Sequence, residues 1–144
     1  MSQSEPSTSN KQKVQQKVQQ ILTREEKVLF IAVQNSPLSI NLSPDSVVLT
    51  NRRFIIYRPK LLGGASFEDY IWRDLQDARL KEGMMRSTLT FKTVKGKVLH
   101  IIDLPKEEAR RAYAIAQEME EKVLEERRQR QIEEKRAAAG GVIL

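Results

Sequence analysis

The chain has 144 residues, enough for one domain with one hydrophobic core, and it is 40% hydrophobic and 31% charged. It contains no cysteine, which excludes disulfide frameworks and thiolate metal sites and favours a cytoplasmic protein. The longest apolar run, Val28–Val33, is far shorter than the roughly 20 residues of a membrane span. The first ten residues lack the charged and then apolar pattern of a secretory signal.

The formal net charge of +6 is unevenly distributed. Residues 105–144 carry nine basic and nine acidic side chains, whereas residues 1–104 carry sixteen and ten. A basic body can favour anionic surfaces such as lipid headgroups or nucleic acid, but an excess of this size also serves solubility. The charge therefore leaves both interpretations open.

The N-terminal part is predicted to contain a tail followed by a helix. Residues 1–10 are rich in Ser, Thr, Pro and Gln, and we expect a disordered tail. Over residues 11–26 we expect an N-terminal helix and a turn. The helix is amphipathic, because apolar residues recur at i, i+4, i+7 and i+8, namely Val14, Val18, Ile21 and Leu22. Thr23 and Glu26 have the spacing of a capping box, which could start a single helical turn.

Residues 27–124 are predicted to form the domain, which begins with short apolar runs separated by turn residues. The predicted strands are Val28–Val33, Val47–Thr50, Phe54–Tyr57, Ser66–Trp72, Leu75–Lys81, Thr88–Val94 and Val98–Ile102. The second and third of these should form a tight hairpin that turns near Asn51. Seven strands with mostly short connections are typical of an antiparallel meander, so the fold class is mainly β, a sandwich or barrel with a C-terminal α-helix.

A long helix is predicted to follow, starting around Pro105 and the glutamates after it. Its apolar stripe, expected to pack on the sandwich, consists of Ala112, Ile115, Ala116, Met119 and Val123. Residues 125–144 form a charged helical extension and tail, in which residues 125–136 should project into solvent and Gly140 should end the helix. The apolar terminal residues suggest that the tail docks on a partner, or that the chain is a piece of a longer protein.

Catalytic patterns are missing from the sequence. The one histidine, His100, lies in a predicted strand, and no motif supports a nucleophile beside it. Gly63 and Gly64 lie between strands and lack the spacing of a phosphate-binding loop. We therefore expect no enzymatic activity, no metal site and no cofactor.

Basic side chains gather at two hairpins. The candidates for an anionic ligand are Arg52, Arg53, Arg58, Lys60, Lys95 and Lys97. The first four cannot line one spot, because the strand between them spans roughly 13 Å at about 3.3 Å per residue. The alternative is that they protect a sheet edge and keep the protein soluble. The second group lacks interleaved aromatic residues, so we expect no nucleic-acid partner.

Apolar side chains that could form an interface lie in one strand and in the tail. Tyr70 and Trp72 share a strand face and pack in the core, unless the tryptophan is exposed and marks an interface. The other interface candidates are Ile132, Val142, Ile143 and Leu144. The extension lacks sustained heptad positions, which argues against a self-sufficient coiled coil.

Two strings, residues 22–30 (LTREEKVLF) and 48–57 (VLTNRRFIIY), resemble the bacterial pleckstrin-homology (PH-like) domain family. The resemblance runs from about Leu22 to Leu124 and is most specific at residues 49–53. It implies a seven-stranded, strongly bent sandwich closed by a helix, no catalytic activity and a tendency to form homo-oligomers. The connection of residues 34–45 contains no Lys or Arg, so the phosphoinositide binding of eukaryotic relatives does not carry over.

The sequence thus predicts a non-catalytic, cytoplasmic PH-like module for interaction or scaffolding, which self-assembles or docks on a protein partner. The alternative is a membrane-peripheral protein that binds anionic lipid, or another anionic ligand, through the basic loop residues.

Overall fold

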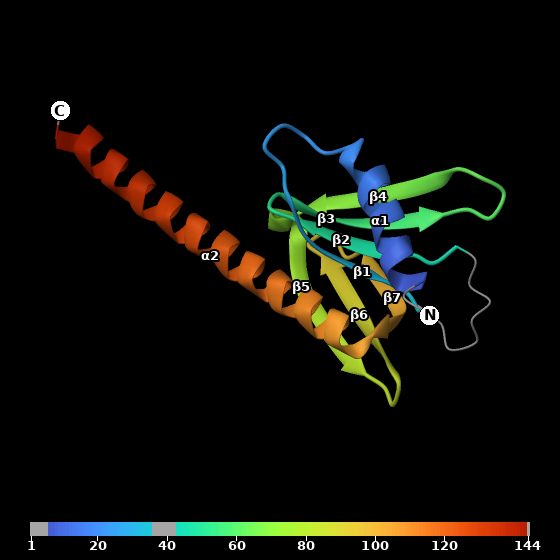
Figure 1. The fold of residues 1–144 in the computed structure, drawn as a ribbon. Helices are drawn as coiled ribbons and strands as arrows, with labels where there is room; N and C mark the ends of the chain where they lie inside the picture. The colour runs from blue at the N-terminus through green and yellow to red at the C-terminus, as the bar shows by residue number, and fades with distance from the viewer. Residues whose placement is uncertain (1–5, 36–42, 144) are drawn as a thin grey trace.

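The computed structural model of the protein describes residues 6–35 and 43–143, with side chains for 10–35 and 43–140 (Figure 1). The elements in chain order are α1 (Pro6–Gln19), β1 (Val28–Val33), β2 (Ser46–Thr50), β3 (Arg53–Pro59), β4 (Ala65–Ile71), the short 3₁₀ helix η1 (Trp72–Asp74), β5 (Leu75–Glu82), β6 (Arg86–Thr93), β7 (Val98–Pro105) and α2 (Lys106–Ile143). None of the described helices is long and apolar enough to cross a membrane.

The strands form two antiparallel sheets in which neighbours along the chain are neighbours in space. The first sheet has the order β1-β2-β3-β4 and the second β5-β6-β7. All seven predicted strands are confirmed, and the sheets form a sandwich rather than a closed barrel. The fourth strand is one residue shorter than predicted at its end, because Trp72 leaves the strand and begins η1.

The main core lies between the two sheets and under α2. Phe54 stands at its centre and stacks on Phe91 of the opposite sheet, with ring centroids 4.5 Å apart. The alternate residues Val47 and Leu49 of β2 face the same core. Along α2 the predicted stripe packs as expected, with Ala112, Ala116, Ile115, Met119 and Val123 against this core.

A second cluster of buried residues lies on the outer face of the first sheet, under α1 (Figure 1). Val14 and Val18 of the predicted amphipathic helix cover Val48 and Ile55, and both faces of β2 and β3 are therefore buried. Double burial explains why these strands are continuous apolar runs and not alternating ones. The helix begins at Pro6, earlier than the predicted start at residue 11, and includes residues 6–10 of the expected tail. The first five residues lie outside the described part of the chain.

The helix α2 is 38 residues long and extends well beyond the sheets (Figure 1). Every residue from 125 to 140 is exposed, as predicted for the charged extension. Pro105 closes β7, and the helix begins one residue later. The predicted stop at Gly140 is wrong, because the helix continues to Ile143. A glycine commonly ends a helix by adopting a positive φ. Gly140 does not have a positive φ, so the helix continues through it.

Candidate functional site

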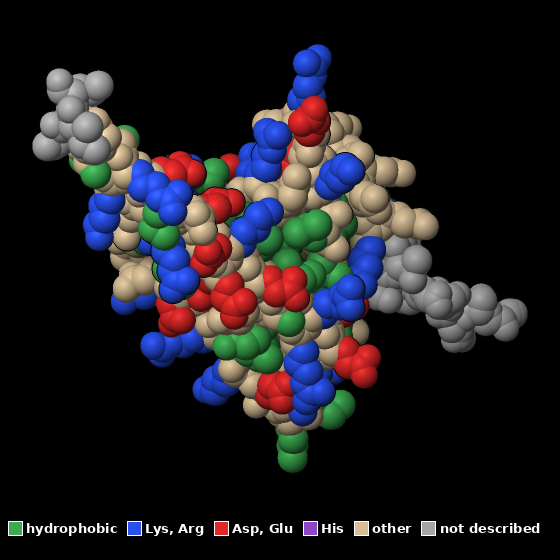
Figure 2. All heavy atoms as spheres, turned by 90° about the vertical axis from the view of Figure 1, so that its left-hand side faces the viewer, with side chains coloured by type: hydrophobic (Ala, Val, Ile, Leu, Met, Phe, Trp, Pro, Cys, Tyr) green, Lys and Arg blue, Asp and Glu red, His purple; other side chains and the backbone are tan. Residues whose placement is uncertain are grey.

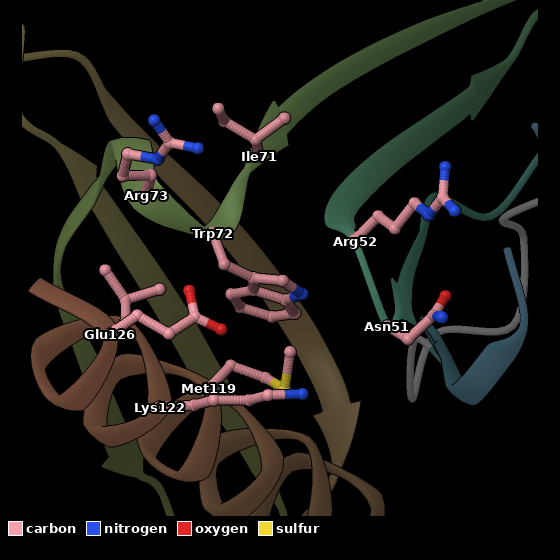
Figure 3. Close-up of a pocket in the computed structure, with 9 residues that line it drawn as sticks. Asn51, Arg52, Ile71, Trp72, Arg73, Met119, Lys122 and Glu126 are labelled. Carbon is pink, nitrogen blue, oxygen red and sulfur yellow. The ribbon is translucent and has the colours of Figure 1, made fainter. Parts of the chain in front are cut away.

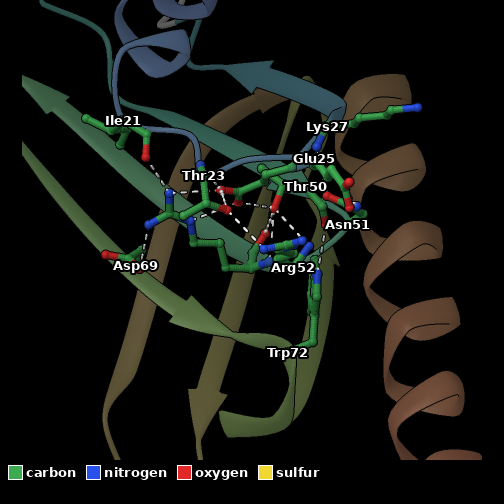
Figure 4. Close-up of polar contacts among 11 residues, drawn as sticks. Ile21, Thr23, Glu25, Lys27, Thr50, Asn51, Arg52, Asp69 and Trp72 are labelled. Carbon is green, nitrogen blue, oxygen red and sulfur yellow. Dashed lines mark hydrogen bonds and ion pairs between the residues drawn. The ribbon is translucent and has the colours of Figure 1, made fainter.

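The residues that carry the resemblance meet in one polar cluster, although they come from two distant segments (Figure 4). We call it the turn cluster, and it consists of Thr23, Glu26, Thr50, Asn51 and Arg53. The Arg53 guanidinium holds the buried Glu26 carboxylate at two points: Nε donates to Oε2 at 2.9 Å, and Nη2 donates to Oε1 at 3.0 Å. Thr50 donates its hydroxyl to Oε2 at 2.7 Å. The Thr23 backbone N–H donates to Oε1 at 2.9 Å, as the capping box predicts.

The Thr23 hydroxyl behaves differently from the capping-box prediction. It donates to the Glu26 carboxylate at 3.1 Å, and the Glu26 backbone N–H bonds to the Thr23 carbonyl instead. The segment is therefore a turn, and a helical turn does not form there. Glu25 in this turn has a φ of 65°, the left-handed conformation that a tight reversal requires.

Further bonds from the turn cluster tie three elements together. Nη2 of Arg53 also donates to the carbonyl of Ile21 at 2.8 Å, and Nη1 pairs with Asp69 of β4 at 3.0 Å. The Asn51 side chain accepts from the backbone N–H of Lys27 at 2.8 Å. The cluster therefore fixes the segment after α1 to the β2–β3 turn and to β4.

The electrostatics of the cluster keep the glutamate ionised. Burial by itself would raise the pKa of Glu26. The hydrogen bonds from Arg53, Thr23 and Thr50 outweigh burial, and the positive charge of Arg53 adds to them, so the pKa falls from 4.5 to about 2. The hydrogen bond to Glu26 likewise raises the pKa of Arg53. The Arg53 guanidinium therefore stays charged and stabilises the fold through these contacts.

A pocket of about 220 Å³ lies next to the turn cluster, between the β2–β3 turn, η1 and the middle of α2 (Figure 3). We call it the Trp72 pocket, and its lining residues are Asn51, Arg52, Ile71, Trp72, Arg73, Met119, Lys122, Val123 and Glu126. The Trp72 indole faces Met119 and Lys122, with Arg52 on one side and Glu126 on the other. Indole Nε1 donates to the Thr50 carbonyl at 2.8 Å, which fixes the ring.

The predicted anionic-ligand residues do not converge on one site. Three of them are engaged in ion pairs: Arg53 in the turn cluster, Arg58 with Asp45 at 2.7 Å, and Lys97 with Glu68. The remaining three lie apart on different hairpins. Arg52 lines the Trp72 pocket, Lys60 is exposed at the end of β3, and Lys95 is exposed between β6 and β7.

The predicted interface residues also differ in their environments. Trp72 is 4% exposed and belongs to the core, where it contacts Phe54. Tyr70 is half-buried, and its hydroxyl donates to Glu68 at 2.7 Å. Ile132 lies on the exposed half of α2. Val142 and Ile143 are described only as helical backbone, with no description of their side chains, and Leu144 lies outside the described residues.

The histidine lies on the surface beside a threonine of the neighbouring strand. His100 is exposed on β7, with Nδ1 2.9 Å from the hydroxyl of Thr90. Within residues 6–35 and 43–143, no group of three or more His, Asp or Glu side chains could hold a metal ion.

Two antiparallel sheets of four and three strands, with a helix over the core, define a PH-like domain, a class that generally binds proteins or lipids and is generally non-catalytic. The family model described as bacterial PH domain matches residues 22–118. The chain therefore belongs to the bacterial PH domain family, and α1 and the exposed half of α2 lie outside the matched residues.

The chain is similar to a solved structure described as the pleckstrin homology (PH) domain of USP37. The two are 14% identical, with a TM-score of 0.45, over 67% of this chain and 97% of that chain. No curated protein matches the sequence.

Sequence reasoning missed most of the Trp72 pocket. Ile71, Arg73 and Lys122 were not identified as candidates, and Met119 and Val123 were predicted only as helix packing residues. No local signal could have found the pocket, because its lining comes from three segments that the fold alone brings together.

Proposed function

We propose that the protein is a non-catalytic interaction module that assembles with itself through the exposed half of α2, or docks this helix on another protein. The observation that carries the proposal is a run of exposed helix from residue 125 to 140. One hydrogen bond, from Arg127 to the carbonyl of Arg73 at 3.4 Å, joins it to the body. In proteins most helical stability comes from packing of one helix face, so a projecting helix gains stability when a partner covers it.

The charge order of the extension favours a second copy as that partner. Residues 125–128 are Glu-Glu-Arg-Arg and residues 133–136 are Glu-Glu-Lys-Arg. In two antiparallel helices Glu125 would lie level with Arg136, Glu126 with Lys135, Arg127 with Glu134, and Arg128 with Glu133, and the pairs on the facing sides of the two helices would be in contact. Each pair joins opposite charges, whereas a parallel pairing in register would oppose like charges.

The test is the mass in solution, by light scattering, of the full chain and of a chain that ends at Leu124. We expect a multiple of 16.6 kDa for the full chain and a monomer for the shortened one. Equal masses for both would show that the extension does not mediate assembly.

A charge exchange tests the antiparallel pairing. Arg127→Glu with Arg128→Glu should reduce the mass, and adding Glu133→Arg with Glu134→Lys should restore it, because each pair again joins opposite charges. Failure of the fourfold variant to recover the mass would rule out this pairing.

The basic loop residues give weaker support to an anionic-ligand role. Arg53, Arg58 and Lys97 already have carboxylate partners, and the remaining candidates are spread over separate hairpins. Protein interaction is therefore the function that we favour.

A further inference from the structure

The Trp72 pocket gathers cations that have no acidic partner. Arg52, Arg73 and Lys122 line it, and no carboxylate of the described residues lies within ion-pair distance of any of them. The lining contains a single acid, Glu126, so the pocket has an excess of positive charge.

The same pocket exposes apolar surface. Ile71 is 45% exposed at the end of β4, and Met119 and Val123 of α2 are half-buried beside the Trp72 ring. Figure 2 looks onto the side of the molecule from which α2 projects and shows hydrophobic side chains near the centre of the face, with Lys, Arg, Asp and Glu side chains around them. An apolar centre with a charged rim is the arrangement of a protein-interaction site.

The walls of the pocket are held in place by the turn cluster. The Arg52 backbone N–H donates to the Thr50 hydroxyl at 3.0 Å, and its carbonyl accepts from the Trp72 backbone N–H at 3.3 Å. The Trp72 indole is bonded to the Thr50 carbonyl as well. A site formed before binding loses less conformational freedom when it binds a ligand.

We propose that the Trp72 pocket binds an acidic peptide segment of a partner protein. An aliphatic side chain of the peptide packs on Ile71 and Met119, beside the nearly buried Trp72 ring. Its neighbouring carboxylates pair with Arg52, Arg73 and Lys122. The inference rests on the proposed role as a protein-interaction module and names the chemistry of its partner.

The volume and the charge of the Trp72 pocket favour an acidic peptide as its ligand. A volume of about 220 Å³ is below the roughly 300–1,000 Å³ of small-molecule pockets and suits one or two side chains. Guanidinium groups bind carboxylates in a two-point geometry.

The test uses a fluorescently labelled peptide with two glutamates on each side of a leucine, and the same peptide with glutamines in their place. Binding is followed by anisotropy of the label and by emission of Trp72, the only tryptophan in the chain. We expect the acidic peptide to bind and to change the Trp72 emission.

Arg73→Glu with Lys122→Glu should weaken binding at least about tenfold, because two attractive charges become repulsive. All four substituted side chains in this pair and its control are exposed, so we expect folding to be retained, and circular dichroism checks it.

The matched control is Lys92→Glu with Lys95→Glu, the same charge change at exposed positions on β6 and the turn after it. Equal weakening in the control would show a non-specific charge effect and overturn the proposal. So would no binding of the acidic peptide, or equal binding of the glutamine peptide. Tighter binding to phosphatidylserine vesicles, lost in the pocket variant, would assign the pocket to a lipid surface instead.

Light scattering on the same samples separates this proposal from the proposed function. If the chain assembles through α2 but the peptide does not bind, the pocket assignment fails and the module function stands. If neither assembly nor peptide binding occurs, both fail.

Discussion

Arg53 and Glu26 lie 27 positions apart in the sequence and face each other as a two-point ion pair, with donor–acceptor distances of 2.9 and 3.0 Å. The Glu26 side chain has no exposed surface, and that of Arg53 is 16% exposed. The pair connects the segment after α1 to the start of β3. A conspicuous arginine of the sequence therefore serves the fold and is not available to a ligand.

The first prediction concerns removal of one partner of this pair. Glu26→Gln should lower the free energy of unfolding by about 3 kcal/mol, because the Arg53 guanidinium loses the charge that compensates for its burial. Arg53→Lys should also destabilise, since an ammonium cannot bind both carboxylate oxygens in the same plane. Urea unfolding followed by Trp72 emission measures both changes. The control is Arg79→Lys, in a pair whose arginine is 80% exposed, where we expect a change within about 0.5 kcal/mol.

The second prediction is an acid-dependent loss of stability through Glu26. Its pKa is about 2 in the folded protein against 4.5 in the unfolded chain. The resulting stabilisation is fully present above pH 4.5 and is lost as the pH falls through about 2, and it amounts to about 3 kcal/mol. Unfolding free energies between pH 2 and pH 7 should therefore fall with acid more steeply in the native chain than in Glu26→Gln. Parallel pH curves for the two proteins would contradict this assignment.

The third prediction concerns Glu120, which faces β5 from α2. Burial raises its pKa, and the negative charge of Asp77 adds to this effect. Oε1 of Glu120 is buried and has no hydrogen-bond partner. Because its folded-state pKa is raised, the native protein binds this proton more readily than the unfolded chain, and the side chain destabilises the fold increasingly as the pH rises through its titration.

Glu120→Gln should accordingly raise the melting temperature at pH 7, and the gain should shrink toward pH 4. Calorimetry at both pH values measures the difference. Glu121→Gln, an exposed neighbour on the same helix, is the matched control and should change little. A lower melting temperature for Glu120→Gln at pH 7 would show that the carboxylate stabilises the fold.

The fourth prediction tests whether α1 is part of the folded domain. Val18 is fully buried between α1 and the outer face of the first sheet. Val18→Ala should lower the free energy of unfolding by about 2 kcal/mol, because it removes two buried methyl groups and leaves a cavity. Lys17→Ala, at an exposed position of the same helix, should leave it nearly unchanged. Equal, small effects of both substitutions would mean that α1 contributes little to stability.

Much of the fold could be predicted from local patterns. The alternation in β6 and the stripe of α2 each reflect a period of the backbone, and the structure confirms them. The continuous apolar runs around Val47 and Phe54 reflect strands that are buried on both faces, and these strands are confirmed too. The ends of the helices and strands were harder to predict from the sequence. Pro6 starts a helix, a position that proline tolerates well. Gly140 lies inside a helix, because the continuing hydrogen bonds of the helix outweigh a single-residue preference.

The candidate site could be predicted only in part. Trp72 was expected to share a strand face with Tyr70, but Trp72 leaves the strand and begins η1. Its indole N–H donates a hydrogen bond to the Thr50 carbonyl. Arg53 and Arg58 were candidates for a ligand, and both have carboxylate partners in the fold. Those partners lie at distances in the sequence that no periodicity encodes.

The sequence by itself determined the number of strands, the packing face of α2 and the absence of thiol chemistry, because each depends on composition or on a repeat of two or 3.6 residues. The tertiary structure decided which cations are neutralised and which remain unpaired around Trp72. Charge compensation depends on distances of a few ångströms between side chains, and these are set only when strands and helices far apart in the sequence come together.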